Sequence, residues 1–395
     1  MKKTKKLPFK YFVRRVMALL ILGLIIYGCF FFRVEIIEIF KPKDNEIVDT
    51  DVLPSNKLSL VMVGDALIHS AVYIDAEVGD TYNFKPMLEL MKPIISKYDL
   101  AYYNQETILG GKELGLSTYP RFNSPYELGD DFLDTGFNLI SMANNHTLDR
   151  GETAVINSCN YWKDKEKTFG VYTAGSYCSL EDRDAVKIYE KNGIKYAMLS
   201  YTTTTNGIYP PSGKEYLTNI YSDEKAKTDI EKYRDKVDLL MVAMHWGEEY
   251  THKPVYSQTR IANYLSSLGV DIIIGAHPHV VEPIEKIGNT LVIYSLGNFI
   301  SAQIGIDKLT GLMVSVNITK DSNTNKINIS DVEAELLHTY YGKDYSKKRN
   351  FKVYPYTSLT DEVLPNHNEY YNTYMNIATN GADWIKRGDY SGNSK

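Results

Sequence analysis

The stretch DIIIGAHPH, residues 271–279, joins a short apolar run to two histidines. A continuous apolar run of this kind predicts a buried strand whose faces are covered by other layers of the fold. The histidines follow at the carboxyl end of that strand, which is where open α/β sheets bind their ligands. The stretch therefore indicates both a fold class and a place for chemistry.

The same pattern recurs along the chain, where short β-rich runs alternate with amphipathic stretches. The predicted strands are residues 58–63, 100–103, 137–142, 196–200, 237–244, 271–274 and 291–294. The predicted helices are residues 85–95, 152–165, 223–233 and 257–268. This alternation predicts an α/β domain with mostly parallel or mixed sheets. Residues 310–338 predict a terminal pair of strands separated by the turn-rich DSNTN.

The N-terminus has the pattern of a membrane anchor. Residues 1–15 contain lysines and arginines without any acid, and Val16–Phe32 carries no charge. At about 1.5 Å per residue this uncharged run is about 26 Å long, and apolar residues up to position 40 extend it. We expect a cytoplasmic basic segment at 1–15, a single transmembrane helix at 16–40 and an extracytoplasmic remainder. A cleaved signal peptide is the alternative, but no small-residue cleavage site follows the run.

The remaining sequence divides into three predicted parts. Residues 41–57 are polar and proline-punctuated and predict a linker, residues 58–340 the α/β domain, and residues 341–395 a peripheral C-terminal segment. The chain has a formal net charge of −5 even with its basic start, so the domain itself is acidic and poorly suited to nucleic acid. Cys159 and Cys178 are the only cysteines outside the apolar run, which excludes a disulfide framework or a thiolate zinc cluster. Whether the two cysteines pair stays open.

Polar side chains follow five of the predicted strands. These candidate metal ligands are Asp65, Glu106, Asn145, His146, His245, His277 and His279. Carboxylates, a carboxamide and neutral imidazoles form the ligand set of Zn, Mn or Fe at hydrolytic centres. The sequence therefore predicts a divalent-metal site at one rim of the sheet.

Each signal also has a structural interpretation. Asp65 could cap a turn, Asn144 and Asn145 could form a turn, and His245 could be a core histidine with a satisfied hydrogen bond. The paired histidines His277 and His279 are harder to explain by packing. The joint occurrence of all these residues at strand ends favours the metal site over the separate structural roles.

Six motifs in order carry a family resemblance. They are GDALIH (64–69), NQET (104–107), ANNHTLDRG (143–151), HWGEEY (245–250), GAHPHVVEP (275–283) and YSLGNF (294–299). Together they resemble the CapA type of capsule synthesis protein, which is associated with poly-γ-glutamate synthesis. That family is in turn similar to the calcineurin-like metallophosphoesterases. The resemblance implies a two-sheet α/β sandwich flanked by helices and a site for two divalent ions.

The resemblance also implies a role for each ligand. Asp65 and His279 would bind one ion, Asn145 and His245 would bind the other, and Glu106 would bridge them. The metal would be Mn, Zn or Fe, its identity being left open.

Further residues complete the implied site. His277 would fill the shell of the second ion, and His146 would be the acid that protonates a leaving oxygen. Asp149 would orient His146 or cap the following helix, of which the cap is the favoured use. Phosphoesterases place a histidine two residues after the first aspartate, whereas His69 comes four residues after Asp65, which leaves its role in doubt. Asn144 is a further supporting candidate.

Three more residues are candidates for support or substrate contact. Trp246 is expected to shape the loop that aims His245, and Glu249 follows in the same motif. Asn298 is expected to hold the histidine loops through hydrogen bonds, with substrate contact as the alternative.

Two functions fit these observations. The first is an extracytoplasmic metal-dependent hydrolase-like protein of capsule or poly-γ-glutamate biosynthesis or export. The second is a non-catalytic partner that binds metal and an anionic envelope polymer and assists the subunits of a membrane polymer synthase. The presence of His146 favours chemistry over a pure polymer clamp.

Overall fold

Successive side chains of β1 (Lys57–Leu67) point into two different hydrophobic layers. Leu60 and Met62 lie in one cluster of buried residues, and Val61 and Val63 lie in another. This alternation is the two-residue period of a β-strand. Because both faces are apolar, β1 is covered on both sides, as the sequence predicts.

The computed structural model describes Met17, residues 56–342 and residues 347–390. The predicted anchor at 16–40 lies outside the described residues apart from Met17, as do residues 1–15 and nearly all of the predicted linker. Among the helices that are described, none combines the length and the apolar character needed to cross a bilayer.

Two mixed sheets form the core of the fold. The larger has the strand order β16-β15-β14-β1-β4-β5-β6, with β13 paired to β1 and β17 to β15. Besides β1, its strands are β4 (Leu100–Asn104), β5 (Leu139–Ser141), β6 (Tyr172–Ala174), β13 (Asn298–Ser301), β14 (Thr310–Lys320), β15 (Ile327–Tyr340), β16 (Lys352–Pro355) and β17 (Lys386–Arg387). The smaller has the order β11-β12-β10-β9-β8-β7. Its strands are β7 (Tyr189–Lys191), β8 (Ile194–Thr202), β9 (Leu239–His245), β10 (Ile272–Ala276), β11 (Ile284–Ile287) and β12 (Thr290–Ile293).

The two sheets pack face to face. Met62 of β1 shares one buried cluster with Met241 of β9 and Ile274 of β10. The alternate residues of β9, Leu240 and Val242, face a different cluster with the helices. The predicted two-sheet α/β sandwich is therefore confirmed.

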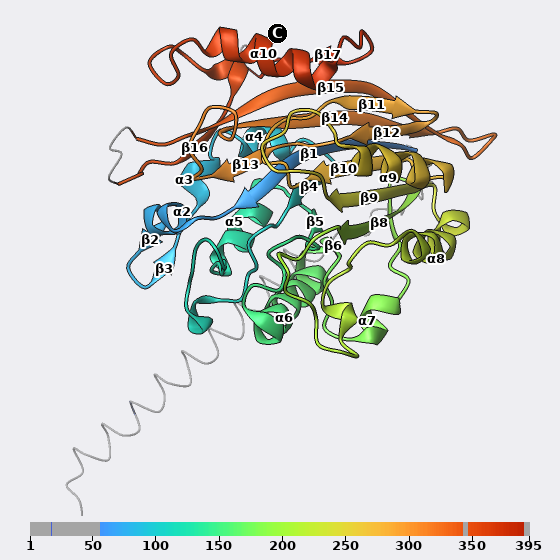
Figure 1. Cartoon of the computed structure of the whole chain (residues 1–395), viewed down its shortest axis with the longest axis horizontal. Coiled ribbons are helices and arrows are strands. Elements are labelled where there is room, and N and C mark those ends of the chain that lie inside the picture. Colours follow the sequence, from blue (N-terminus) through green and yellow to red (C-terminus); the bar gives the residue numbers. More distant parts are fainter. Residues whose placement is uncertain (1–16, 18–55, 343–346, 391–395) are drawn as a thin grey trace, which may run out of the picture. The chain divides into compact units, whose positions relative to one another are not determined.

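Helices cover the outer faces of both sheets (Figure 1). The described α-helices are α2 (Ser70–Asp75), α3 (Lys85–Leu88), α4 (Lys92–Ile95), α5 (Glu127–Thr135), α6 (Gly151–Phe169), α7 (Leu180–Asp184), α8 (Asp223–Tyr233), α9 (Tyr256–Ser267) and α10 (His367–Thr379). Ile230 of α8 and Leu265 of α9 pack on the smaller sheet, and Phe132 of α5 and Trp162 of α6 on the larger. A two-stranded ribbon, β2 (Glu77–Val78) with β3 (Thr81–Tyr82), and four short 3₁₀ turns, Lys112–Leu114, Glu215–Leu217, Arg234–Lys236 and Tyr356–Ser358, complete the described elements.

Most of the predicted elements are confirmed, but the single helix predicted at 85–95 is wrong. The structure has two short helices there, α3 and α4, with Pro86 and Pro93 in their first turns. Proline lacks a backbone N–H and clashes with the preceding turn, so Pro93 begins a new helix instead of continuing the old one. The hairpin predicted at 310–338 is present as the antiparallel pair β14 and β15.

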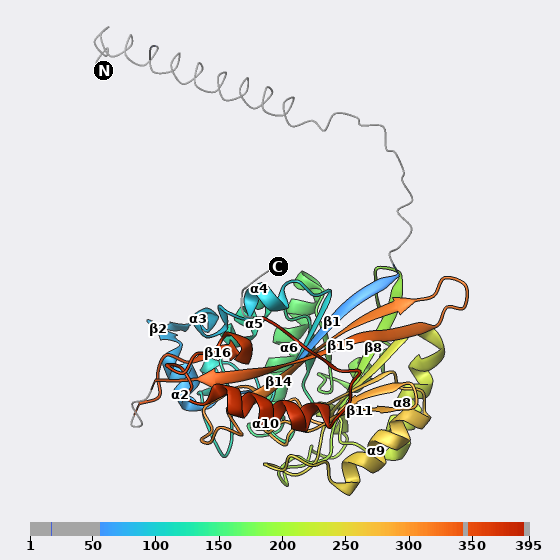
Figure 2. The same ribbon diagram turned by 90° about the horizontal axis from the view of Figure 1, so that it is seen from above.

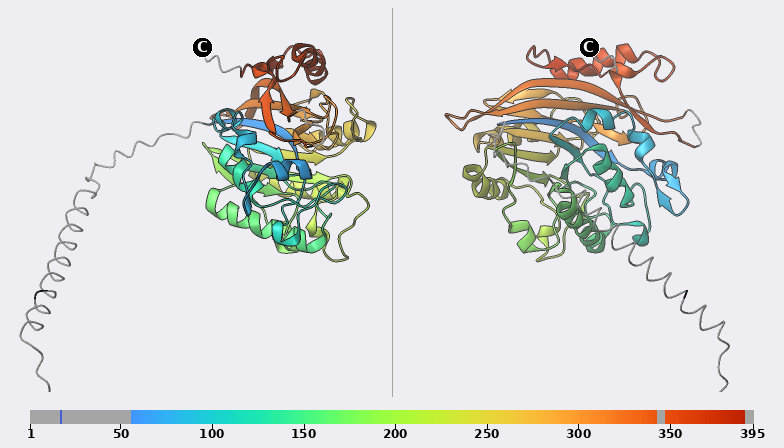
Figure 3. Two further views of the ribbon diagram at one scale, coloured as in Figure 1. Left: turned by 90° about the vertical axis from the view of Figure 1, so that its left-hand side faces the viewer. Right: turned by 180° about the vertical axis from the view of Figure 1, so that it is seen from behind.

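The C-terminal segment, predicted as peripheral, lies against the larger sheet. β16 pairs with β15, and Met375 and Ala378 of α10 are buried in the cluster between the layers. Figure 2 shows α10 along the long strands β14 and β15, and Figure 3 shows the same helix above them from behind. The segment thus shields a sheet face that would otherwise be exposed.

Cys159 of α6 and Cys178 are joined by a disulfide bond. This settles the pairing that the sequence leaves open. The bond ties α6 to the segment that leads into α7, and it removes both thiols as metal ligands.

Candidate metal centre

The candidate ligands gather where the carboxyl ends of strands from both sheets meet. β1 supplies Asp65, and the loops after β4 and β5 supply Glu106 and Asn145. From the smaller sheet, β9 ends at His245, which pairs in register with Ala276, and the histidines 277 and 279 follow directly. The predicted site is therefore assembled from two sheets, and the side chains of all six predicted ligands are buried.

Glu106 is the side chain of this group that most needs a balancing positive charge. Both of its carboxylate oxygens are buried without a hydrogen-bond partner among the described residues. Its Oε1 lies 3.7 Å from Nε2 of His245 and 3.6 Å from Nε2 of His279. Burial raises the pKa of Glu106 well above its usual range, although the neighbouring His279 opposes this. A buried carboxylate in this position needs a proton or a cation to balance it.

His279 lies between two carboxylates. Its Nδ1 is 3.2 Å from Oδ2 of Asp65 and 3.1 Å from Oδ1 of Asn298. Burial opposes a charge on this imidazole, but the carboxylates of Glu106 and Asp65 outweigh it and raise the pKa of His279 to about 9. The same carboxylates that attract a proton would attract a metal ion.

His245 and His277 are held in the neutral state. Burial is the main cause that lowers the pKa of His245 well below its usual value and that of His277 to about 3. Their ring centroids are 4.6 Å apart, and Nε2 of His245 lies 2.9 Å from Oδ1 of Asn145. Nδ1 of His277 has no partner among the described residues. Neutral imidazole with an unused nitrogen is the form that binds metal.

These donors fit a divalent ion. Glu106, His277 and His279 each offer one ligand atom, and these atoms lie within 4.8 Å of one another. Asp65 adjoins this group through its contact with His279. Asn145 adjoins it through its contact with His245. The orphaned oxygens of Glu106 and the unused nitrogen of His277 are the features that a cation would satisfy.

The histidine loop has an unusual backbone. His277 has φ 99° and His279 has φ 59°, on either side of Pro278. Positive φ is uncommon for residues other than glycine and is concentrated at functional sites. The main chain of β1 also contacts the segment at Gly297, because the Asp65 N–H donates to the carbonyl oxygen of Gly297 at 2.9 Å. Gly297 has φ 61°, a backbone conformation that glycine adopts without strain.

His146 has a carboxylate partner of its own. Its Nδ1 lies 2.7 Å from Oδ2 of Asp149, which also accepts the Phe122 N–H at 2.7 Å. The helix that follows, α6, has Arg150 at its N-cap position and no side-chain cap. The favoured prediction that Asp149 caps this helix is therefore wrong, and the alternative that it orients His146 agrees with the geometry.

The supporting candidates have different positions. The Asn144 side chain accepts the His146 N–H at 2.9 Å and donates to the Gln105 carbonyl at 2.8 Å, so it holds the loop. Trp246 is buried and donates to the Tyr294 carbonyl at 2.9 Å. Asn298 donates to the carbonyl oxygens of His279 and Lys308, which agrees with the expected role in holding the histidine loop.

His69 and Glu249 lie outside this group. Nδ1 of His69 is 3.1 Å from the carbonyl oxygen of Leu67, and its ring contacts Phe122 with the centroids 5.3 Å apart. Burial lowers the pKa of His69 to about 4. Glu249 is exposed to solvent. Neither belongs to the cluster of Glu106, His277 and His279 that could hold an ion.

Two residues of the site were not anticipated from the sequence. Asn104 donates from Nδ2 to Oδ1 of Asp65 at 2.8 Å and lies 3.3 Å from Nδ1 of His245, so it connects the two sheets. A polar residue at the end of a buried strand was the available signal. Phe122 packs edge-on against His146 with the centroids 4.7 Å apart, and no periodicity marks it within its loop.

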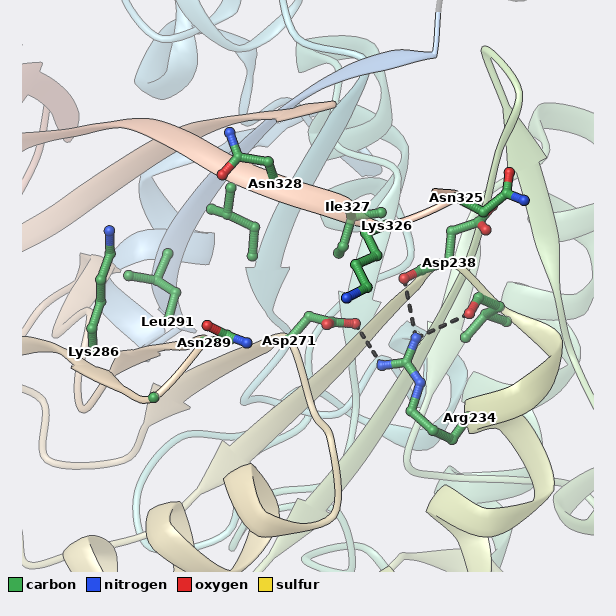
Figure 4. Close-up of a pocket in the computed structure, with 13 residues that line it drawn as sticks. Arg234, Asp238, Asp271, Lys286, Asn289, Leu291, Asn325, Lys326, Ile327 and Asn328 are labelled. Atoms are coloured by element: carbon green, nitrogen blue, oxygen red, sulfur yellow. Dashed lines mark hydrogen bonds and ion pairs between the residues drawn. The ribbon is translucent and has the colours of Figure 1, made fainter. Parts of the chain in front are cut away.

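One cavity of about 530 Å³ lies at the opposite ends of the strands, beside Asp238 and Asp271, which precede β9 and β10. Figure 4 shows Arg234 joined to Asp271 in this cavity, and the guanidinium Nη1 lies 2.7 Å from Oδ2 of the carboxylate. The cavity is thus separate from the candidate ligands, and charges of both signs line it.

The sequence has measurable similarity to known proteins. The family model described as bacterial capsule synthesis protein PGA_cap matches residues 59–303. "PGA biosynthesis protein CapA" from Bacillus subtilis (strain 168) is 28% identical over 211 residues, covering 51% of this chain and 52% of the relative. "Capsule biosynthesis protein CapA" from Bacillus anthracis is 26% identical over 314 residues, covering 76% of this chain and 71% of the relative. The chain thus spans about half the length of the first of these relatives.

Two solved structures are also similar. One is a putative 5'-nucleotidase from Staphylococcus aureus in complex with alpha-ketoglutarate, with a TM-score of 0.46 and 17% identity, covering 70% of this chain and 54% of that one. The other is TT1561 of Thermus thermophilus, with a TM-score of 0.37 and 8% identity, covering 69% of this chain and 98% of that one. The family match extends over more than half of the residues and includes all six motifs. The chain belongs to the bacterial capsule synthesis protein family.

Proposed function

We propose that this protein acts in the biosynthesis or export of a capsule polymer, with poly-γ-glutamate as the polymer class, through a hydrolase-like site that binds two divalent ions. The observation that carries the proposal is Glu106, a buried carboxylate whose two oxygens lack hydrogen-bond partners among the described residues. Asp65, His245, His277 and His279 surround it. The name of the Bacillus anthracis relative supports the capsule setting, and the name of the Bacillus subtilis relative supports PGA biosynthesis.

The protein's own residues would divide the work. Asp65, Glu106 and the histidines 245, 277 and 279 would hold the ions together with Asn145. Bound ions would stabilise negative charge that develops on an oxygen of the scissile group. His146 would transfer a proton to the leaving oxygen from Nε2, because its Nδ1 faces Asp149.

The proposed location is extracytoplasmic, with residues 16–40 as a single membrane anchor. The disulfide between Cys159 and Cys178 supports it, since such bonds persist in oxidising compartments. Protease digestion of intact cells, compared with lysed cells, tests this part: degradation of the domain only after lysis would contradict it.

The central experiment is metal analysis of the full-length protein with His277→Ala/His279→Ala as the test variant. His338→Ala is the matched control, because His338 is also buried but lies in β15 outside the candidate centre. We expect bound metal in the wild type and the control and at least about a tenfold loss of metal affinity in the test variant. Equal metal content in all three proteins would refute the metal site.

Hydrolysis assays on a phosphodiester model compound and on poly-γ-glutamate separate the two functions. Metal-dependent cleavage of either that is lost in His146→Ala supports the enzyme. A metal-loaded protein that cleaves neither, and whose His146→Ala variant still supports polymer production in cells, would favour the non-catalytic partner of a polymer synthase.

A further inference from the structure

A second cavity of about 410 Å³ lies beside the candidate metal centre and carries a strongly basic wall. The lining residues that matter here are His69, Ser70, Thr118, Lys347, Lys348 and Arg349. The described residues that line it include no aspartate or glutamate. This is notable in a chain whose formal net charge is −5.

Two of the three cations in this wall are not neutralised within the described part of the chain. Lys347 and Arg349 make no ion pair with any described residue. The cavity of Figure 4 differs in this respect, because its Arg234 is paired with Asp271. Unpaired positive charge facing a cavity attracts anions from solution.

Contacts on both sides of Arg349 hold the backbone of this segment in place. Nζ of Lys348 donates to the carbonyl oxygen of Ala302, and the carboxylate of Asp75 in α2 accepts the N–H groups of Asn350 and Phe351 at 3.0 and 2.8 Å. The backbone of Arg349 therefore lies between two anchored neighbours. Such anchoring reduces the conformational entropy that binding would cost.

The cavity is linked to His146 through two ring contacts. The His69 ring packs on Phe122, whose other ring contact is His146, with centroid distances of 5.3 and 4.7 Å. The peptide of Ala302 adjoins both His69 and Lys348, since its N–H lies 3.4 Å from Nδ1 of His69. An anion beside the basic wall would thus be separated from the candidate acid by the rings of His69 and Phe122.

A third cavity of about 530 Å³ lies on the Asp149 side of His146 and is lined by the exposed Arg121. The loop residues Ser117 and Thr118 border the third cavity and the basic cavity respectively. Basic groups therefore occur on both sides of this loop. Spaced cations suit a chain of repeated negative charges better than one small anion.

We propose that Lys347, Lys348 and Arg349, together with His69, Ser70 and Thr118, form a subsite that binds carboxylate groups of an acidic polymer beside the metal centre. Below we call this set the basic subsite. The inference rests on the proposed function and uses the same polymer class, poly-γ-glutamate. The three basic residues lie beyond residue 303, where the family match ends.

The test is binding of poly-γ-glutamate of defined length to the full-length protein. The test variant is Lys347→Glu/Arg349→Glu. The control is Lys167→Glu/Lys236→Glu, which changes the net charge by the same amount at exposed lysines outside the three cavities. We expect the test variant to lose at least about tenfold in affinity and most of its salt dependence, while the control stays near the wild type.

Small probes distinguish the sources of negative charge. Monomeric glutamate and inorganic phosphate should each compete much more weakly than the polymer, because neither spans several cations. Competition by phosphate at the level of the polymer would overturn the assignment to a polycarboxylate. Equal affinities of the test and control variants would overturn the subsite.

Metal content, measured in the same samples, separates this inference from the proposed function. The test variant should retain the metal of the wild type. Polymer binding that depends on the basic residues in a protein without metal would leave the subsite standing and refute the metal centre. Metal binding with no loss of polymer affinity in the test variant would do the reverse.

Discussion

Nδ1 of His146 lies 2.7 Å from Oδ2 of Asp149, and both side chains are buried. The carboxylate orients the imidazole from one side, while the Asn144 side chain holds the backbone N–H of His146 from the other at 2.9 Å. This arrangement directs Nε2 away from Asp149 and makes Asp149 a positioning residue for the proposed acid.

Asp149→Asn should lower kcat by about tenfold to a hundredfold and change KM little. The reason is that the amide can present its NH₂ group to Nδ1 of His146 where the carboxylate presents an oxygen. Metal content and the unfolding midpoint should stay near those of the wild type, since Asn keeps an oxygen for the Phe122 N–H. Steady-state kinetics measure this, on whichever of the two assay compounds, the phosphodiester model or poly-γ-glutamate, the wild type cleaves. An unchanged kcat would show that the contact has no catalytic role.

Glu106→Gln should abolish the stabilisation that metal gives the folded protein. Because a ligand at a hundredfold excess over its Kd contributes about 2.7 kcal/mol, chelation should clearly lower the unfolding midpoint of the wild type. The Gln variant should unfold at the same temperature with and without chelator. Glu335→Gln is the matched control, because Glu335 is also buried with one unpartnered oxygen yet lies outside the centre. It should keep the response to chelator.

Asn298→Ala should weaken metal binding without contacting the ion. Oδ1 of Asn298 lies 3.1 Å from Nδ1 of His279, and its Nδ2 donates to the Lys308 carbonyl at 2.8 Å. Loss of such an outer contact typically costs about 10- to 100-fold in metal affinity. Titration calorimetry with Mn²⁺ or Zn²⁺ measures it. Asn138→Ala, at the amino end of β5, controls for loss of a structural asparagine and should leave the affinity unchanged.

Loss of the proton from buried Glu335 should make the protein less stable as pH rises. Burial raises its pKa from 4.5 to about 8, while the hydrogen bond from the Thr357 N–H opposes the shift. Between these two values the folded protein holds a proton that the unfolded chain has released. The contribution of Glu335 to the free energy of unfolding therefore falls by up to about 1.4 kcal/mol per pH unit across this window.

Glu335→Gln removes this proton linkage. The stability of the variant relative to the wild type should therefore increase from about pH 5 to about pH 8, as measured by urea unfolding at several pH values. Parallel stability curves for the two proteins would mean that Glu335 titrates normally in the fold.

Local sequence patterns were sufficient for much of the fold. The apolar runs that became β8, β9 and β10 predicted their strands, because a buried strand needs apolar side chains on both faces whatever its partners are. Helix α8 was predicted with the observed bounds, 223–233. The helix at 85–95 was predicted wrongly, since amphipathic spacing was given more weight than the proline at position 93.

The candidate site, like the fold, was predicted from the sequence only in part. The sequence by itself indicated which residues come together, because Asp65, Glu106 and the histidines 245, 277 and 279 all follow apolar runs and the carboxyl ends of such strands meet at one rim. Only the tertiary structure decided their partners: that Asp149 faces His146 instead of capping α6, that Asn104 links Asp65 to His245, and that the disulfide forms. It also brought Lys347, Lys348 and Arg349, from a segment predicted as peripheral, beside His69. Periodicity reports the surroundings of each strand, whereas contacts between distant segments depend on how two sheets pack, which no local pattern contains.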